Sequence, residues 1–207
     1  MIIVGFGKIP TNVCNTDLLF AVKRAFGCQN SQYIAQIESR KSERSQIEGL
    51  AALLCLKALI DMIDETDVHQ LKLVRSENGK PYFENSDLQF SISHSYGYVA
   101  CAISDEGEIG IDIEALKLTD ERAARLSQRY FDADNTHYDA KSFAREWTRK
   151  EAEVKLHGGR LGEYLSQTND ANKNVFFTEF EIDGHPITLC TAKMPLQIEK
   201  IEVKFDF

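Results

Sequence analysis

Asp112 and Glu114 are the first residues whose types and spacing could support chemistry. They end the apolar segment Ile109-Gly110-Ile111-Asp112-Ile113-Glu114, which is typical of a β-strand. Side chains two residues apart on a strand share a face, so we expect both carboxylates to point the same way. Such a pair needs a cation between its members or must take up a proton, and paired oxygen ligands suit Mg²⁺. A strand end with its acidic face in water is the alternative.

A second set of candidate residues lies in the segment 143–155, which has an apolar stripe at helical spacing. Lys150 and Glu151 flank this stripe, so their charged groups lie where the helix faces inward. Burying them is costly unless they are paired, bound to a metal or facing a ligand. Glu151 and Lys155 also have the i,i+4 spacing of an ordinary surface ion pair, which is the alternative explanation.

A third group of candidates consists of residues that can donate to a phosphate. Ser93 and His94 end a strand-like segment that alternates apolar residues with serines, and Lys80 lies in the turn 78–81. Arg44 stands near the start of an apolar helix, together with Arg40 and Lys41, and its guanidinium could grip a phosphate. A histidine that is solvated or satisfied by local partners, and ordinary surface cations, are the alternatives. No Gly-x-Ser-x-Gly motif supports a serine hydrolase.

The elements that must position these residues alternate between helices and strands in both halves of the chain. Helical patterns cover 17–39, 42–63, 120–131 and 139–156, and strand patterns cover 2–7, 88–93, 98–103, 109–113, 175–182, 187–192 and 198–205. Helices followed by antiparallel strands, twice over, predict an α+β fold of two similar halves. We place the halves at residues 1–105 and 106–207, the second half carrying the metal site.

Composition narrows the class of protein. The chain has 207 residues, of which 43% are hydrophobic, so it can bury a sizeable core. Its formal charge of -8 argues against sequence-independent binding to nucleic acid. No apolar run is long enough to span a bilayer, and the first residues show no leader, so we expect a cytoplasmic protein without a membrane partner. The five scattered cysteines are expected to be reduced and to pack in apolar surroundings.

Four motifs in this order resemble the 4'-phosphopantetheinyl transferase superfamily, most of all its larger, surfactin-type members. They are Gly79-Lys80-Pro81, Ser91-Ile92-Ser93-His94-Ser95, Gly110-Ile111-Asp112-Ile113-Glu114 and Trp147-Thr148-Arg149-Lys150-Glu151-Ala152-Glu153-Val154-Lys155. The likeness covers about residues 40 to 162. It implies a monomer of two similar α/β halves in a pseudo-twofold arrangement, with coenzyme A bound in the cleft between them.

The resemblance also implies roles for the candidate residues. Asp112, Glu114 and Glu151 would form an acidic Mg²⁺ site. Coenzyme A would be held by Arg44, Lys80, Ser93, His94, Lys150 and Lys155, with His94 at the ribose phosphate. The implied reaction moves the 4'-phosphopantetheine group of coenzyme A to a serine of an apo acyl or peptidyl carrier protein. Glu151 would take the serine proton, and Lys155 would assist the departure of adenosine 3',5'-bisphosphate.

Two other functions are consistent with these residues. One is a Mg²⁺-dependent enzyme that acts on another nucleotide or pyrophosphate with the same acids and lysines. The other is a non-catalytic module that keeps the fold and binds coenzyme A or a carrier protein. Coenzyme A turnover without a modified protein would favour the first, and binding that is insensitive to Mg²⁺ and leads to no transfer would favour the second.

Overall fold

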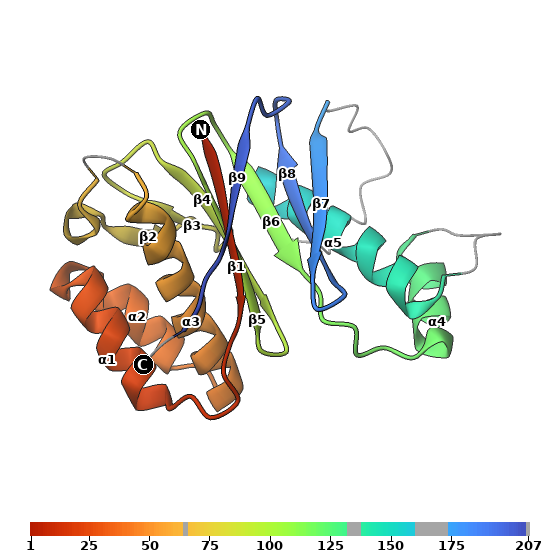
Figure 1. Ribbon diagram of the computed structural model, residues 1–207, viewed down its shortest axis with the longest axis horizontal. Helices are drawn as coiled ribbons and strands as arrows, with labels where there is room; N and C mark the ends of the chain where they lie inside the picture. The colour runs from red at the N-terminus through yellow and green to blue at the C-terminus, as the bar shows by residue number, and fades with distance from the viewer. Residues whose placement is uncertain (64–65, 132–137, 160–173, 206–207) are drawn as a thin grey trace.

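The computed structural model describes residues 1–63, 66–131, 138–159 and 174–205 (Figure 1). The helices are α1 (Asn15–Phe26), α2 (Ser31–Glu38), α3 (Glu43–Ile60), α4 (Asp120–Tyr130) and α5 (Ala140–His157), with short 3-10 turns at Cys28–Asn30 and Val68–Gln70. The strands are β1 (Ile2–Lys8), β2 (Leu73–Arg75), β3 (Pro81–Phe83), β4 (Gln89–Ser95), β5 (Tyr98–Ser104), β6 (Ile109–Ile113), β7 (Phe176–Ile182), β8 (His185–Thr191) and β9 (Ile198–Glu202). The predicted α+β class is confirmed.

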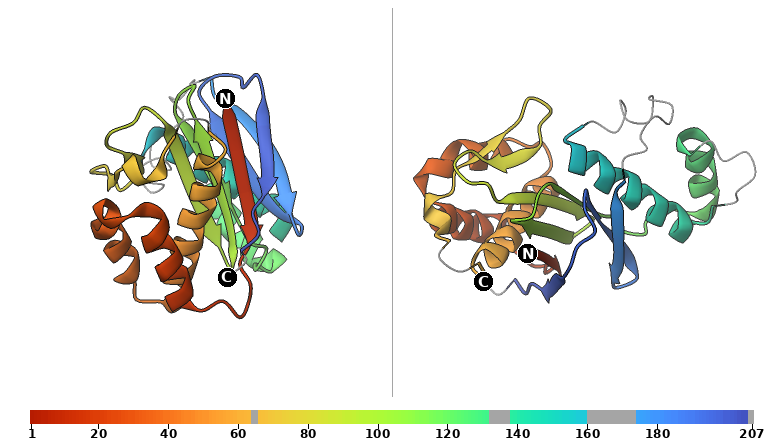
Figure 2. Two further views of the ribbon diagram at one scale, coloured as in Figure 1. Left: turned by 60° about the vertical axis from the view of Figure 1, so that its left-hand side comes forward. Right: turned by 90° about the horizontal axis from the view of Figure 1, so that it is seen from above.

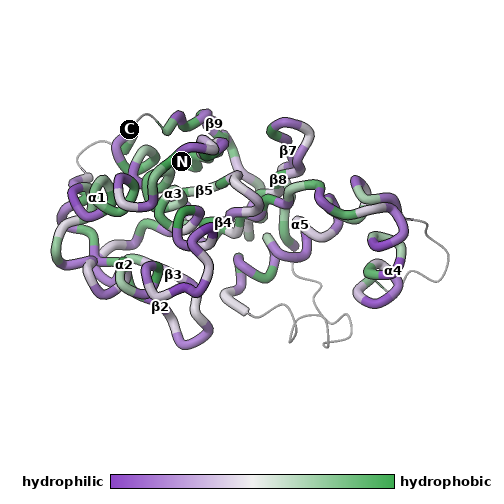
Figure 3. The backbone as a smooth tube through the Cα atoms, turned by 90° about the horizontal axis from the view of Figure 1, so that it is seen from below, coloured by the Kyte–Doolittle hydropathy of each residue, from purple (hydrophilic) through white to green (hydrophobic). Residues whose placement is uncertain are grey.

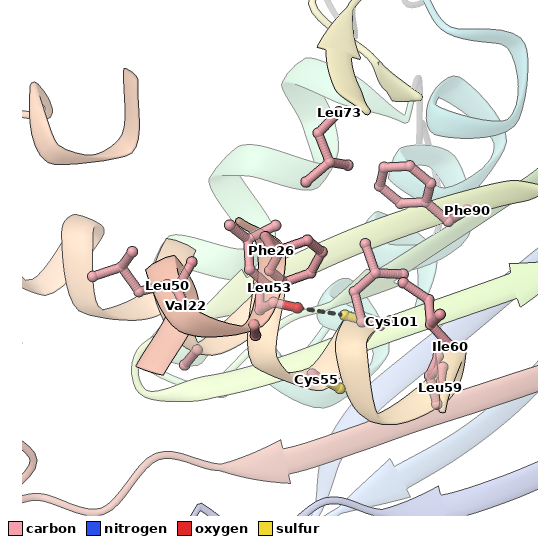
Figure 4. Close-up of a cluster of buried hydrophobic side chains, with 14 of the residues drawn as sticks. Val22, Phe26, Leu50, Leu53, Cys55, Leu59, Ile60, Leu73, Phe90 and Cys101 are labelled. Carbon is pink, nitrogen blue, oxygen red and sulfur yellow. Dashed lines mark hydrogen bonds between the residues drawn. The ribbon is translucent and has the colours of Figure 1, made fainter. Parts of the chain in front are cut away.

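Strands of the first half, together with β9 from the other end of the sequence, form a four-stranded sheet covered on one face by helices. The strand order is β4-β5-β1-β9, and α3 packs against β5, β1 and β4. One face of β5 and the apolar side of α3 form the main core, in which Leu53, Leu59 and Ile103 are almost completely buried. Figure 4 shows this cluster, including the Cys101 thiol that donates to the carbonyl oxygen of Ala52. The core holds α3, and therefore the residues at its start, in a fixed position.

The second half is a three-stranded antiparallel sheet of order β6-β8-β7, covered by α5. Helix α5 starts at Asp139, whose carboxylate accepts a hydrogen bond of 2.7 Å from the amide of Ser142. It ends at Gly158, which adopts the left-handed conformation that glycine tolerates best. The seam with β6 is very close, because a Cβ placed on Gly110 would lie 1.9 Å from the carbonyl oxygen of Ala152. The face of β6 that carries Gly110 therefore faces α5.

The two sheets meet through an apolar core and through a row of serines. Ile2 and Val4 of the first sheet pack with Ile109, Ile111 and Leu189 of the second. Strand β4 lies beside β6 without pairing to it through its backbone (Figures 1 and 2). Instead, three serine hydroxyls of β4 accept hydrogen bonds from amides of the facing chain, Ser91 from Ile111, Ser93 from Ile113 and Ser95 from Ala115. We call these three residues the serine ladder.

The end of the chain returns to the first sheet. Strand β9 pairs in parallel with β1, from Ile2 opposite Ile198 to Phe6 opposite Glu202. The amide of Val203 then donates to the carbonyl oxygen of Phe6, and the ring of Phe205 is buried in the core beneath α3. Figure 2 (left) shows β1, in red, beside the blue strand β9 in the same sheet. Residues from both ends of the sequence therefore complete one core.

Hydropathy follows this architecture. In Figure 3 the hydrophobic segments run along α3 and β5, whereas α4 is mostly hydrophilic. Within the described part of the chain, no helix is long and apolar enough to cross a membrane. Cys55, Cys101 and Cys190 are buried free thiols, as expected, but Cys14 and Cys28 are exposed. The prediction that all five cysteines lie in apolar surroundings is thus wrong for these two, which stand at the N-terminus of α1 and directly after α1.

Candidate active site between the two halves

Asp112 is the buried centre of the candidate site. It is only 5% exposed on β6, on the strand face that Gly110 turns toward α5. The hydroxyl of Ser93 donates to Asp112 Oδ1 over 2.7 Å, and the ammonium group of Lys155 on α5 donates to the same oxygen over 2.6 Å. A buried carboxylate costs little when it is paired and hydrogen-bonded in this way. Asp112 thus joins β4, β6 and α5 at one point.

Glu114 follows Asp112 on the same side of the strand. Its Oε1 accepts a hydrogen bond of 3.2 Å from the hydroxyl of Ser95. Burial and the negative charge of Asp112 raise the pKa of Glu114 to about 7, while Ser95 and Lys155 oppose the rise. The alternative of an acidic strand face in open water does not describe these two residues. They form a partly desolvated pair of like charges, as their i,i+2 spacing predicted.

Glu151 approaches the same pair from α5. Burial and the charge of Asp112 raise the pKa of Glu151, and Lys155 opposes the rise. The charge of Glu151 in turn contributes to the raised pKa of Glu114. The three carboxyl groups are therefore close enough to destabilise one another's ionised forms. An ordinary Glu151–Lys155 surface pair does not describe α5, because the Lys155 ammonium reaches across to Asp112 instead.

The acids fit a cation that is only partly coordinated by protein. Among the described residues, no group of three or more His, Cys, Asp or Glu side chains is arranged closely enough to hold a metal ion by itself. Mg²⁺, however, usually takes only one or two carboxylates and completes its shell with water and substrate phosphate. The donor chemistry therefore suits Mg²⁺. The positive charge that neutralises Asp112 in this structure is the Lys155 ammonium.

A pocket of about 240 Å³ opens beside these acids and is lined from both halves of the chain. The turn at Gly79–Pro81 and strand β4 form one wall, and Glu151, Lys155 and Gly158 of α5 and its C-terminus form the other. Lys80 crosses the pocket, and its ammonium donates to the carbonyl oxygen of Leu156 over 2.9 Å. Burial lowers the pKa of Lys80. The pocket brings two lysines and a glutamate together, which suits a phosphorylated ligand.

His94 lies near the other end of the serine ladder, and its ring is satisfied by protein partners, which is one of the two alternatives to a phosphate ligand. Its Nδ1 is 3.1 Å from the Glu48 carboxylate, and its Nε2 is 3.4 Å from Nη1 of Arg40. Sequence reasoning missed Glu48 entirely and chose Arg44 instead of its neighbour Arg40. A glutamate inside the most apolar helix of the chain was the signal that could have found the first of these.

Three predicted binding residues are engaged elsewhere in the structure. Arg44 stacks on the ring of Tyr96, 5.5 Å from its centre, in a separate pocket with Lys8 and Tyr98. The ammonium of Lys150 lies 5.4 Å from the centre of the Phe131 ring. The hydroxyl of Ser93 is committed to Asp112 and to the amide of Ile113. The structure therefore assembles the predicted acids with Lys80 and Lys155, places His94 beside Arg40, and leaves Arg44 and Lys150 outside the pocket.

Comparisons with known proteins agree with this geometry. The sequence profile of the 4'-phosphopantetheinyl transferase superfamily matches residues 108–201, the part that contains all three acids. The 4'-phosphopantetheinyl transferase AcpT of Salmonella typhimurium (strain LT2) is 30% identical over 128 residues, which are 58% of this chain and 67% of the relative. The chain belongs to the 4'-phosphopantetheinyl transferase superfamily.

Other relatives cover different shares of the chain. The 4'-phosphopantetheinyl transferase gsp of Aneurinibacillus migulanus is 28% identical over 166 residues, 76% of this chain and 66% of the relative. A 4'-phosphopantetheinyl transferase of Bacillus subtilis is 35% identical over 116 residues, 53% of this chain and 51% of the relative. Proteins named AcpT and gsp both match, so the likeness is not confined to one subgroup of the superfamily.

Proposed function

We propose that this protein transfers the 4'-phosphopantetheine group of coenzyme A to a serine of an apo acyl or peptidyl carrier protein and releases adenosine 3',5'-bisphosphate. The observation that carries the proposal is the meeting of Asp112, Glu114 and Glu151 with Lys80 and Lys155 beside a pocket formed by both halves. The names of the relatives, all 4'-phosphopantetheinyl transferases, support the same reaction.

Substrate binding uses the cations that line the pocket. Lys80 and Lys155 supply positive charge for the pyrophosphate of coenzyme A, and their present partners are the Leu156 carbonyl oxygen and Asp112. Asp112, Glu114 and Glu151 would hold Mg²⁺, which when bound neutralises negative charge at the pyrophosphate. His94 and Arg40 offer a second place for a phosphate, which we assign to the ribose phosphate. Lys150 would also contact the phosphates, for which its ammonium group must move away from the Phe131 ring.

The transfer itself needs one proton acceptor and one donor. The serine oxygen of the carrier forms a bond to the phosphorus nearest pantetheine, and the bond from that phosphorus to the oxygen of adenosine 3',5'-bisphosphate breaks. Glu151 accepts the serine proton. Lys155 donates a hydrogen bond to the leaving oxygen. No covalent enzyme intermediate is required, because positioning and charge supply most of the rate in phosphoryl chemistry.

The test is transfer onto isolated carrier proteins. We expect incubation with coenzyme A, Mg²⁺ and a panel of apo carriers to add the mass of phosphopantetheine to at least one carrier, measured by mass spectrometry of the intact protein. Removal of divalent ions with a chelator should stop the reaction, and added Mg²⁺ should restore it. A carrier that stays unmodified while coenzyme A is consumed would instead indicate an enzyme acting on the pyrophosphate alone.

The acid variants test the site assignment. Asp112→Asn and Glu151→Gln each remove one negative charge without changing size, so we expect transfer to slow by at least about a hundredfold, within the range that loss of one catalytic group causes. Glu153→Gln is the matched control, because Glu153 lies on α5 near Cys190 and outside the pocket. Normal turnover in both acid variants would refute the assignment, provided that circular dichroism shows them to be folded.

A further inference from the structure

Glu48 is a buried carboxylate in an otherwise apolar part of α3. It is 7% exposed, and the residues that follow it, Gly49, Leu50 and Ala51, are buried as well. A charge in such a position is costly unless both of its oxygens have partners. Oε1 accepts a hydrogen bond of 2.8 Å from the amide of Gly97, and Oε2 lies 3.1 Å from Nδ1 of His94. Both partners belong to the hairpin of β4 and β5.

The carboxylate remains ionised in this position. Burial by itself raises the pKa of Glu48, but hydrogen bonds from His94 and from the Gly97 amide outweigh that effect, so the pKa lies below its ordinary value. The positive charge of Arg44 acts in the same direction. A fixed negative charge therefore stands against one nitrogen of the His94 ring. It also holds the turn at Tyr96–Gly97, in which both residues have positive φ angles.

The other nitrogen of the ring is aimed at a guanidinium. A carboxylate can only accept, so Nδ1 carries the proton that points to Glu48, and Nε2 is left to face Arg40. Arg40 is itself fixed, because its Nη1 donates to the Ser45 carbonyl oxygen over 2.8 Å. The Arg40 guanidinium packs against α3 at Gly49, which has no side chain. A Cβ at Gly49 would lie 2.5 Å from Nη1 of Arg40.

We propose that Glu48 is a positioning residue for coenzyme A binding: it orients His94 so that Nε2 and the Arg40 guanidinium together receive a phosphate. The inference rests on the proposed use of coenzyme A by this chain. The Glu48 carboxylate accepts from Nδ1 and so holds the ring with Nε2 turned toward Arg40, where an anion would meet both groups. The charged groups around the ring are Glu48 and Arg40, with Arg44 behind Glu48.

The Glu48→Gln variant separates charge from size. The glutamine oxygen can still accept from the Gly97 amide, but its NH₂ group then faces Nδ1 as a donor. The proton of the neutral ring should therefore move from Nδ1 to Nε2. Nitrogen-15 NMR of the His94 imidazole reports this change directly. A variant that only loosened the local structure would not produce a clean switch from one tautomer to the other.

Binding measurements test the consequence for the ligand. We expect Glu48→Gln to bind coenzyme A roughly tenfold more weakly by titration calorimetry, because the His94 ring loses the charged partner that holds it in place. The KM for coenzyme A should rise with little change in kcat. Glu48→Asp, which keeps the charge, should recover part of the affinity. Dephospho-coenzyme A lacks the ribose phosphate, so it should bind with equal affinity to the wild-type protein and to Glu48→Gln.

The controls make the result decisive. In a His94→Ala background, Glu48→Gln should weaken coenzyme A binding no further, and Glu43→Gln, an exposed acid at the start of α3, should have no effect. Unchanged affinity in Glu48→Gln, or an equal loss in the His94→Ala background, overturns the inference. The proposed function is judged separately by carrier modification. Weaker coenzyme A binding in Glu48→Gln together with an unmodified carrier would overturn that function and leave the role of Glu48 standing.

Discussion

At the scale of single residues, Gly110 decides whether Asp112 can reach α5 at all. Its missing side chain lets the backbone of β6 lie directly against the backbone of α5, where a Cβ would meet the Ala152 carbonyl oxygen at 1.9 Å and the Leu156 amide nitrogen at 2.5 Å. Both obstacles are main-chain atoms, which cannot rotate away. Two residues later on the same face, Asp112 accepts the hydrogen bond from Lys155. The short distance between strand and helix is thus a condition for the carboxylate–ammonium contact.

We therefore expect Gly110→Ala to destabilise the protein by about 3 kcal/mol or more, at the upper end of overpacking effects. Urea denaturation followed by circular dichroism measures the loss. Gly159→Ala is the control, since a Cβ there meets nothing within 4 Å, and its stability should change by less than about 0.5 kcal/mol. Equal stability of the two variants would show that α5 can move away from β6 without cost.

The sequence predicted the residues of the site better than their partners. Asp112, Glu114 and Glu151 are candidates by the i,i+2 rule on a strand and by inward-facing charge on a helix, and both rules depend only on local geometry. The family resemblance joins the three acids into one site. The choice of Arg44 over Arg40 depended on a tertiary contact, because both arginines stand near the start of α3 and only the fold brings one to His94. Glu48 was missed for the same reason: its partners lie 46 and 49 residues away, at His94 and Gly97.

At the scale of elements, the serine ladder takes the place of a backbone ladder between the two sheets. Three alternate side chains of β4 bond to the chain segment from Ile111 to Ala115, and two of them also donate to the acids. The middle serine, Ser93, makes two hydrogen bonds to buried groups. It accepts from the Ile113 amide over 3.3 Å and donates to Asp112 over 2.7 Å. Among the described residues, the Ser91 hydroxyl has one hydrogen-bond partner, the amide of Ile111.

The middle serine of the ladder, Ser93, can be compared with one outer serine, Ser91, by substitution. We expect Ser93→Ala to cost about 2 to 3 kcal/mol of stability, because it leaves the buried Ile113 amide without a partner and removes one of the two hydrogen bonds to Asp112 Oδ1. Ser91→Ala should cost about 1 kcal/mol, since it affects one amide. Thermal and urea unfolding of both variants measures the difference. If Ser91→Ala proved the more harmful change, the ladder would have to act chiefly through packing rather than through the Asp112 contact.

Element positions were largely predictable, whereas pairings were not. The predicted helix 42–63 is α3 at Glu43–Ile60, because its apolar run is too long for a strand. The predicted helix 139–156 is α5 at Ala140–His157, because its apolar residues recur at helical spacing. The single helical region expected at 17–39 is broken at Gly27, whose φ of 69° ends α1. The short hairpin of β2 and β3 was missed, since strands of three residues carry too few alternations to register.

At the scale of the whole molecule, both ends of the chain complete the same core. Phe205 packs beneath α3 with Ile201 and Val203 beside it, and β9 forms an edge of the first sheet. The division at residues 105 and 106 remains a proposal about the two halves. No local pattern in the sequence could indicate the parallel pairing of β9 with β1, because the partners stand almost 200 residues apart and neither strand differs in composition from an antiparallel one.

We expect Phe205→Ala to destabilise the protein by roughly 3 kcal/mol, the lower end of the range for removal of a buried phenylalanine. Leu196→Ala is the matched control, because Leu196 precedes the same strand and is 95% exposed. Urea denaturation should show a clear loss for the first variant and no change for the second. A fully stable Phe205→Ala protein would mean that the chain after β9 contributes nothing to the core.

The parallel pairing of β9 with β1 has a consequence for synthesis on the ribosome. Residues 2–8 emerge first, and β5 can pair with one side of them, but the other side waits until residues 198–202 have been translated. During that interval the nascent chain presents an unpaired strand flanked by apolar side chains, the kind of edge that recruits other chains. Chaperone demand and the risk of aggregation should therefore persist until residues 198–202 have emerged and paired with β1.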